Sequence, residues 1–366
     1  MTTPDFQHSA VRGTFDPTTG VATLTLAMPG RANVINDEFG EGLTSALAWA
    51  RACESLNGII ITSAHKDFCA GADIDRLFAV TDPGELYAGV KSLGALFRDI
   101  ETSKVPVVAA LNGTALGGGY ELALACHHRV ALDHPRTKFG LPEVQLGVIP
   151  GAGGTQRLPR LIGIQAAAEL IAQGKELRCA AALKVGAIDA LVETDEALRE
   201  HALNFIAEHR NCKQPWDEKS SRIPGPQPGS SDARNMLMAA AGMLRKKTAG
   251  VFRAPELALS AISEGLLVDI DTGLDIEARY FVELAVSDAC KDMIRTLWYG
   301  RTAALKGEGL PTYEGAPFKK VGIIGAGMMG AGLAFVCADA GYDVVLKDIG
   351  QDALDKALVH FDDQLK

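Results

Sequence analysis

The 366-residue sequence lacks an apolar run of the roughly 20 residues that a membrane-spanning helix requires. Aromatic residues are few (6%), and acidic residues outnumber basic ones, giving a formal net charge of −9. An acidic chain without a basic, aromatic-rich patch argues against a nucleic-acid-binding surface or an anionic membrane surface. We therefore expect no nucleic-acid partner and no membrane span.

Motifs for metal, disulfide and serine chemistry are also missing. The seven cysteines are scattered and include no CxxC pair, which favours thiols of a reducing compartment over a disulfide framework or a zinc site. The sequence contains no HExxH, Cys/His cluster or GxSxG, so we expect no metal and no serine hydrolase. The N-terminus, MTTPDFQHSAVRGTFD, has neither an apolar signal core nor the Arg-rich look of a transit peptide, which indicates a cytoplasmic protein.

Short apolar runs alternate with helical patterns in the first half of the chain. The predicted helix Asn36–Cys53 begins at Asn36, which is followed by two acidic residues. Strand–helix alternation of this kind predicts an α/β fold. The predicted strands are Val21–Ala27, Gly58–Thr62, Val105–Leu111 and Arg129–Leu132.

Helical patterns dominate further along the chain. Residues 165–190 read as helix with breaks at Gly174 and Gly186, and Ala233–Tyr299 has apolar residues at three- and four-residue spacing. Two segments rich in turn-forming residues, Gln214–Asp232 and Thr302–Pro317, are predicted to be a surface loop and a linker.

Glutamates stand inside two glycine-dense segments. LNGTALGGGYELALAC (Leu111–Cys126) contains Glu121, and FGLPEVQLGVIPGAGGTQRLPR (Phe139–Arg160) contains Glu143. FCAGADID (Phe68–Asp75) adds a third tight turn before a helical run. Glycines let backbone N–H groups approach a ligand, and a helix that begins nearby directs its free amides at an anionic oxygen. Two amides on one oxygen and two carboxyl groups that move protons suit chemistry on an acyl thioester.

The motifs AGAD, NGxAxGGGxEL and PEVxLGxIPGAGGTQRLPR, taken together, resemble the enoyl-CoA hydratase (crotonase) superfamily over about the first half of the chain. Two later stretches, EGLLVDIDTGLDIEARYFVEL and KKVGIIGAGMMGAGLA, resemble the multifunctional fatty-acid β-oxidation α-subunit, in which a 3-hydroxyacyl-CoA dehydrogenase follows the hydratase. The resemblance implies a crotonase-type ββα spiral at residues 1–200, a helical extension and linker at 201–316, and the opening βαβα of a Rossmann domain at 317–366.

The resemblance also implies an activity and its residues. The expected reaction is hydration of 2-trans-enoyl-CoA to 3-hydroxyacyl-CoA, without a cofactor. Glu121 would orient and activate the water, and Glu143 would exchange the proton at C2. The oxyanion hole would consist of the N–H groups of Ala72 and Gly118, where a single such donor is typically worth about 2.7–4 kcal/mol.

Coenzyme A recognition is implied at five positions around the first two turns. Relatives often have a lysine where this chain has Asp75, so the phosphate contact is open between Arg31 and Arg76. The residues expected to hold the adenine and pantetheine are Arg31, Ala32, Ala70, Asp73 and Ile74.

A second nucleotide signature is GAGMMG, which follows a predicted strand (Lys320–Gly325) and opens a predicted helix (Met328–Ala340). Its glycines Gly325, Gly327 and Gly330 are those that cradle the pyrophosphate of NAD, and Asp348 has the position of the ribose-binding acid. Residues 317–366 are fewer than such a domain needs. We therefore expect a truncated domain with weak NAD binding and no dehydrogenase activity.

Two alternatives remain beside hydration. Superfamily members that only move a double bond from Δ3 to Δ2 can work with one carboxylate at the position of Glu143, whereas the presence of Glu121 as well favours hydration. A non-catalytic scaffold for a thiolase or dehydrogenase is the other alternative. The expected partners are an acyl-CoA substrate, a thiolase β-subunit and further copies of the chain. The acyl pocket is expected to depend on Leu77, Val90 and Leu93.

Overall fold

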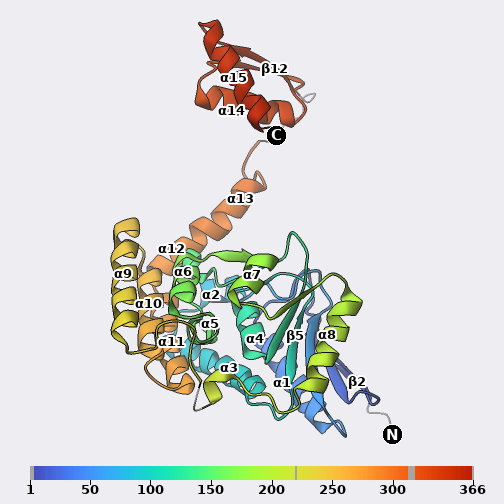
Figure 1. Cartoon of the computed structure of the whole chain (residues 1–366). Coiled ribbons are helices and arrows are strands. Elements are labelled where there is room, and N and C mark those ends of the chain that lie inside the picture. The colour runs from blue at the N-terminus through green and yellow to red at the C-terminus, as the bar shows by residue number, and fades with distance from the viewer. Residues whose placement is uncertain (1–3, 219–220, 312–317, 365–366) are drawn as a thin grey trace. The chain divides into compact units, whose positions relative to one another are not determined.

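Seven strands form the main sheet of the computed structural model, which describes residues 4–218, 221–311 and 318–364 (Figure 1). The first three strands pair antiparallel and the remaining pairs are parallel. All four predicted strands belong to this sheet. In their spatial order the strands are β1 (Phe6–Gln7), β2 (Val11–Asp16), β3 (Val21–Leu26), β4 (Gly58–Ser63), β5 (Val107–Leu111), β7 (His128–Leu132) and β10 (Ala190–Val192).

Both faces of the main sheet are covered, which explains the continuous apolar runs. Ile59 and Ile61 of β4 point into the main core, whereas Ile60 packs with Leu198 and Ile206 of the helix α8 on the opposite face. The helices of this part are α1 (Asp37–Ala52, capped by Asn36 as predicted), α2 (Ile74–Ala79), α3 (Pro83–Glu101), α4 (Gly118–Ala125), α5 (Gly154–Ile162), α6 (Ile164–Gln173), α7 (Cys179–Val185) and α8 (Asp195–Glu208).

A smaller sheet corrects the prediction that residues 165–190 are helical apart from breaks at Gly174 and Gly186: both breaks are present, but a strand follows the first. Gly174, at φ +60°, ends α6, and the chain then runs antiparallel to β8 before α7 begins. A three-residue strand between two helices has too little periodicity to stand out in a sequence. This sheet contains β6 (Ala115–Leu116), β8 (Lys138–Gly140) and β9 (Glu176–Arg178). Of these, β6 lies inside the first glycine-dense segment and β8 overlaps the start of the second.

The predicted helical region after the surface loop is present and packs on the sheet-containing part. Figure 1 shows α9, α10 and α11 side by side next to α5 and α6, and α11 also packs against α3. The elements are η2 (Pro215–Asp217), α9 (Ser231–Thr248), α10 (Arg253–Gly265), α11 (Ile270–Ala285), α12 (Asp288–Met293), the π-helical turn η3 (Ile294–Gly300) and α13 (Arg301–Leu305).

The second linker begins later than predicted. Thr302 is inside α13, and the glycines with positive φ angles, Gly307 and Gly309, come only after this helix. Lys306 is also the last residue of the first of two compact units, Met1–Lys306 and Gly307–Lys366. The predicted linker residues 312–317 lie outside the described part of the chain.

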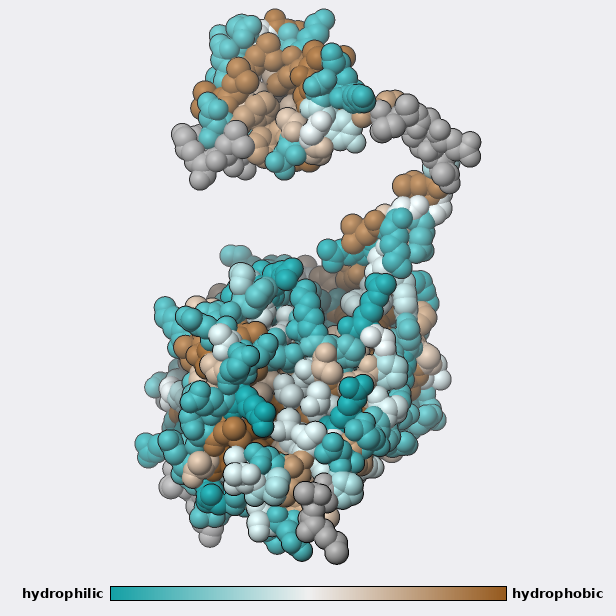
Figure 2. All heavy atoms as spheres, turned by 90° about the vertical axis from the view of Figure 1, so that its right-hand side faces the viewer, coloured by the Kyte–Doolittle hydropathy of each residue, from teal (hydrophilic) through white to brown (hydrophobic). Residues whose placement is uncertain are grey.

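The second unit contains the predicted strand–helix–strand opening. Its parallel strands are β11 (Lys320–Ile324) and β12 (Asp343–Lys347), connected by α14 (Met328–Asp339) and followed by α15 (Gln351–Gln364). Figure 2 shows hydrophobic atoms gathered on the visible face of this unit. Its exposed apolar side chains include Ile324 (90%) and Met328 (89%). Among the helices in the described ranges of both units, none is long and apolar enough to cross a membrane.

Candidate active site

Two glycine turns bring together the two amides predicted for the oxyanion hole. Gly71 and Gly117 have φ angles of +102° and +52°, in the left-handed region that favours glycine. A Cβ at Gly71 would lie 3.0 Å from the Leu116 carbonyl oxygen and 3.6 Å from the Gly118 nitrogen, so only glycine permits this approach. Neither the Ala72 nor the Gly118 N–H has an acceptor within residues 4–218, 221–311 and 318–364.

Both turns border a cavity of about 830 Å³. Glu121 and Glu143 line this cavity, and so do the three side chains predicted to shape the acyl pocket, Leu77, Val90 and Leu93. The helical extension closes another side of it with Phe281, Leu297, Trp298 and Arg301. The cavity thus contains two carboxyl groups and two unused amides within a mainly apolar wall.

Glu121 is held at the first turn of α4 and is 2% exposed. Its Oε1 accepts hydrogen bonds from the N–H groups of Ala152 (2.8 Å) and Gly154 (2.7 Å). Its Oε2 lies on the side of Gly118, 3.8 Å from where a Cβ of that glycine would be. Burial raises the pKa of Glu121, while the amides of Gly154 and Ala152 and the Arg157 charge oppose the rise.

Glu143 begins the 3-10 turn η1 (Glu143–Leu146) and has no such support. Its Oε1 lies 2.9 Å from the Cβ position of Gly117, and its buried Oε2 has no hydrogen-bond partner in the described ranges. Burial, and then the Glu121 charge, raise the pKa of Glu143 well above its usual value. Of the two carboxyls, Glu143 therefore retains its proton to higher pH, and Glu121 ionises first.

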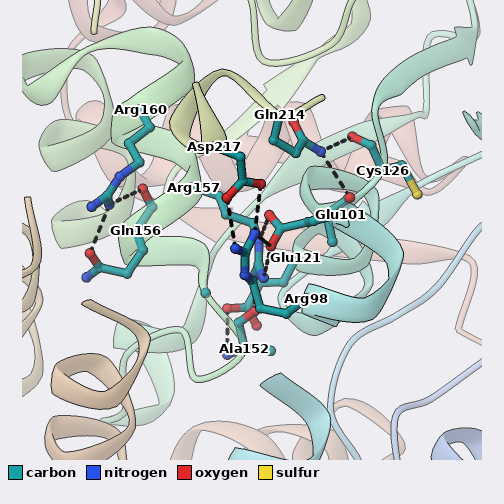
Figure 3. Close-up of polar contacts among 12 residues, drawn as sticks. Arg98, Glu101, Glu121, Cys126, Ala152, Gln156, Arg157, Arg160, Gln214 and Asp217 are labelled. Atoms are coloured by element: carbon teal, nitrogen blue, oxygen red, sulfur yellow. Dashed lines mark hydrogen bonds and ion pairs between the residues drawn. The ribbon is translucent and has the colours of Figure 1, made fainter. Parts of the chain in front are cut away.

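Buried ion pairs fix the loop that binds Glu121. Arg157 pairs with Glu101 of α3 and donates a hydrogen bond to the carbonyl oxygen of Ala152, next to the loop amides (Figure 3). Arg98 connects Glu101 to Asp217. Gln214 donates to the carbonyl oxygens of Ala125 and Cys126 at the end of α4. Figure 3 shows Arg98, Glu101, Arg157 and Asp217 gathered together, whereas Gln214 points toward Cys126.

Glu277 is another buried glutamate that was not identified from the sequence. Glu277 of α11 is 1% exposed and accepts hydrogen bonds from Gly153 and Thr155 of the same loop. The sequence contains a signal for Glu277, because this acidic residue shares the helix α11 with small and apolar residues that are buried, such as Gly273 and Ala278. An acidic residue on the apolar stripe of a helix requires a buried partner.

The structure places three of the five predicted coenzyme A residues in the cavity wall, namely Ala70, Asp73 and Ile74. Asp73 also caps α2 through the N–H groups of Asp75 and Arg76. Arg31 and Ala32 are not among the residues that line the cavity. Neither is Arg76, which pairs with Asp37. Of the lining residues that the structure describes, Arg301 is the basic one, and the sequence did not point to it.

The nucleotide motif of the second unit has the expected local geometry. Gly325 has a φ of +100°, and a Cβ at Gly330 would lie 1.8 Å from the Gly325 carbonyl oxygen, so the turn and the helix meet without a side chain. Gly327 precedes the first turn of α14. Asp348 follows β12 and accepts a hydrogen bond from the Ala326 N–H (2.6 Å), which brings the acid to the glycine turn. These residues fit a dinucleotide-binding turn.

Comparison with protein families decides the assignment of the first unit. Residues 16–215 match the model of enoyl-CoA hydratase/isomerase. The chain belongs to this family. Residues 320–366 match the NAD-binding domain of 3-hydroxyacyl-CoA dehydrogenase. The resemblance on which the predicted activity rested is thereby confirmed, and so is the crotonase-type fold followed by a Rossmann opening.

The relatives include fatty acid oxidation complex subunits alpha. The chain is 38% identical over 345 residues to that of Shewanella loihica and 37% identical over 349 residues to that of Shewanella halifaxensis. Each match covers 93% of this chain and 48% of the relative, so the chain spans about half the length of these curated relatives.

Solved structures of the same fold include hydratases and an isomerase. Human mitochondrial delta3-delta2-enoyl-CoA isomerase is similar with a TM-score of 0.59 and 26% identity, over 81% of this chain and 100% of that one. Enoyl-CoA hydratase from Bacillus halodurans has a TM-score of 0.56 at 24% identity, over 79% and 100% of the two chains, which shows the fold alone.

Proposed function

We propose that this chain hydrates 2-trans-enoyl-CoA to 3-hydroxyacyl-CoA. The observation that carries the proposal is the pair Glu121 and Glu143, a buried glutamate and a half-buried one that line one cavity and have opposite surroundings. Glu121 has two amide donors that favour its ionised form, whereas Oε2 of Glu143 has no hydrogen-bond partner in the described part of the chain and burial raises the pKa of Glu143 well above its usual value. A base and an acid at the same pH are what addition of water across a double bond requires.

The reaction follows from these positions. Glu121 takes a proton from water as the water oxygen bonds to C3 of the enoyl group. The electron pair of the double bond moves towards the thioester carbonyl, and the N–H groups of Ala72 and Gly118 receive the enolate oxygen. Glu143 gives its proton to C2. Water has then contributed OH to C3 and a proton to Glu121, and C2 has gained a proton from Glu143.

The coenzyme A part of the substrate is proposed to lie along Ala70, Asp73 and Ile74, with Arg301 available to a phosphate. The proposed domain limits are 1–200 for the hydratase, 201–316 for the helical extension and linker, and 317–366 for the dehydrogenase opening. A homo-oligomer and a thiolase β-subunit partner remain proposals from the family.

NAD is proposed for residues 317–366 as part of a longer dehydrogenase domain. Gly325, Gly327 and Gly330 would hold its pyrophosphate at the start of α14, and Asp348 its ribose. NAD would supply a hydride acceptor for a 3-hydroxyacyl group. Hydration in the first unit does not use it.

The test is the loss of the conjugated enoyl-thioester ultraviolet absorbance with crotonyl-CoA and decenoyl-CoA, without NAD. The hydration rate of wild type is compared with the rates of Glu121→Gln and Glu143→Gln. Binding of a saturated acyl-CoA is measured for wild type and for each variant. We expect rapid hydration by wild type and a loss of about a thousandfold in each variant, within the range for a general acid or base. Absence of hydration by a wild-type protein that binds acyl-CoA would refute the proposal.

Δ3–Δ2 isomerisation is the second candidate, supported by the similarity to the human isomerase and by the raised pKa of Glu143 in the cavity. Conversion of 3-enoyl-CoA to 2-enoyl-CoA by Glu121→Gln, without hydration, would support it. Full biological activity of Glu143→Gln would instead support a scaffold.

A further inference from the structure

The loop before α5 is held from two sides by two glutamates. Four consecutive backbone amides donate hydrogen bonds to the two glutamates, alternately to one and to the other. Those of Ala152 and Gly154 donate to Oε1 of Glu121, at 2.8 and 2.7 Å. Those of Gly153 and Thr155 donate to Oε1 and Oε2 of Glu277, at 2.5 and 2.8 Å. Displacement of one set of amides therefore displaces the other.

The two glutamates also lie on opposite sides of this loop. Gly151 and Ala152 line both the large cavity and a second cavity of about 410 Å³ between α3 and α11. Glu121 lines the large cavity, and Glu277 lines the second. The loop separates the two cavities, and Glu277 contacts it from the side of the second cavity.

Glu277 has an additional donor in the Thr155 hydroxyl, whose Oγ1 lies 2.5 Å from its Oε2. Three donors on a buried carboxyl call for both of its oxygens to act as acceptors. A glutamine offers one acceptor oxygen and an NH₂ group, so Glu277→Gln leaves a donor of this loop without an acceptor.

We propose that Glu277 is a positioning residue of the proposed hydratase site, which fixes the loop amides that orient Glu121. This inference rests on the proposed function. Glu277 makes no contact with the reacting atoms. Its effect passes through the loop and, once Glu277 is ionised, through its charge.

Glu277 also interacts electrostatically with Glu121 and Glu143. Burial and the Glu121 charge raise the pKa of Glu277 to about 8, and the Thr155 hydroxyl opposes the rise. Once Glu277 is ionised, above about pH 8, its charge adds to the rise in the pKa of Glu143. The charged groups facing Glu277 from the surrounding elements are Glu121, Glu143, Arg157, Arg160, Arg98 and Asp271.

The experiment compares pH profiles of crotonyl-CoA hydration for wild type, Glu277→Gln and a control, Glu283→Gln. Glu283 is on the same helix and pairs with Arg253 at the surface. We expect kcat of Glu277→Gln to fall by about 100-fold with KM changed less than about twofold, because a small displacement of catalytic groups costs that much. Without the Glu277 charge, the alkaline limb of kcat/KM should move about one pH unit lower. The control should match wild type.

Thr155 provides a milder second test that does not alter the glutamate. Thr155→Val removes the hydroxyl donor, so Glu277 ionises at higher pH and the alkaline limb should again move lower. Thr155→Ser retains the hydroxyl and should restore the wild-type profile. A purely structural role would not distinguish these two variants by their pH profiles.

The outcomes separate this inference from the proposed function. Wild-type hydration with an unchanged rate and profile in Glu277→Gln overturns the inference alone. If Glu277→Gln fails to fold, identical profiles of Thr155→Val and Thr155→Ser overturn it. Failure of folded wild-type protein to hydrate crotonyl-CoA overturns the proposed function, and the inference with it.

Discussion

The guanidinium of Arg157 and the carboxylate of Glu101 form an ion pair that solvent does not reach: Nε lies 2.6 Å from Oε1, and both side chains are 0% exposed. The pair joins α5 to α3. Loss of one partner leaves a buried charge with less compensation, which typically costs 3–5 kcal/mol for a pair of this kind.

Arg157→Met is therefore expected to lower the free energy of unfolding of the first unit by about 3 kcal/mol, because Arg98 still contacts Glu101. Urea denaturation followed by tryptophan fluorescence reports on this unit, since Trp49, Trp216 and Trp298 all belong to it. The matched control is Arg51→Met, which breaks the half-exposed pair with Asp99 and should cost less than about 1 kcal/mol. Equal effects of the two changes would contradict the prediction.

The roles of Glu121 and Glu143 can be distinguished by measuring hydrogen–deuterium exchange at C2 of an acyl-CoA. Butyryl-CoA has no double bond to hydrate, so exchange of its C2 protons in D₂O isolates the proton transfer assigned to Glu143. Glu143→Gln should lose this exchange. Glu121→Gln should retain it at a rate no lower than that of wild type, because the Glu121 charge is a cause of the raised pKa of Glu143.

Mass spectrometry of the recovered thioester measures that exchange. Hydration of crotonyl-CoA, recorded in parallel, should be lost in both variants by about a thousandfold. Retention of exchange by Glu143→Gln together with its loss in Glu121→Gln would reverse the two roles.

What the sequence could show was local. Gly71 and Gly117 mark tight turns because their φ angles suit glycine. Glu121 follows Gly117 within a few residues, and Glu143 precedes the positive-φ Gly147. The turns that meet at the cavity were therefore predictable from spacing and family resemblance. The same holds for the glycine turn and Asp348 of the second unit.

What the sequence could not show depends on how distant elements pack. Glu277 reaches the loop before α5 only because α11 lies across α3 and α5, which no periodicity reveals. Arg301 enters the cavity wall for the same reason, as the helical extension folds back over the first turns. The strand β9 was missed because pairing with β8, and not its own pattern, creates it.

A histidine pair makes stability depend on pH. His128 of β7 has its Nε2 3.0 Å from Nε2 of His201 on α8, and its ring is stacked on Phe205. Burial lowers the pKa of His128 from 6.5 to about 4, although Asp189 opposes the shift. The unfolded chain therefore binds more protons than the folded one between these values, so this contribution to stability is present above pH 6.5 and is lost as pH falls towards 4.

His128→Gln removes the titrating group and should reduce the loss of unfolding free energy between pH 7.5 and pH 5. Urea denaturation at several pH values measures it. His134→Gln, in the loop after β7, serves as the control and should keep the wild-type slope. An unchanged slope in His128→Gln would show that other groups cause the acid sensitivity.

Arg301 should contribute to the affinity for coenzyme A, because it lines the cavity together with Ala70, Asp73 and Ile74. Arg301→Gln is expected to raise KM for crotonyl-CoA about tenfold, as loss of a charge-assisted hydrogen bond to a phosphate would. It should have little effect on kcat or on the KM of crotonyl-pantetheine, which lacks the nucleotide. Arg31→Gln and Arg76→Gln test the two arginines that the sequence suggested as the phosphate contact. A larger increase of KM in Arg31→Gln than in Arg301→Gln would assign the phosphate contact to Arg31. If all three variants have the KM of wild type, none of the three arginines is that contact.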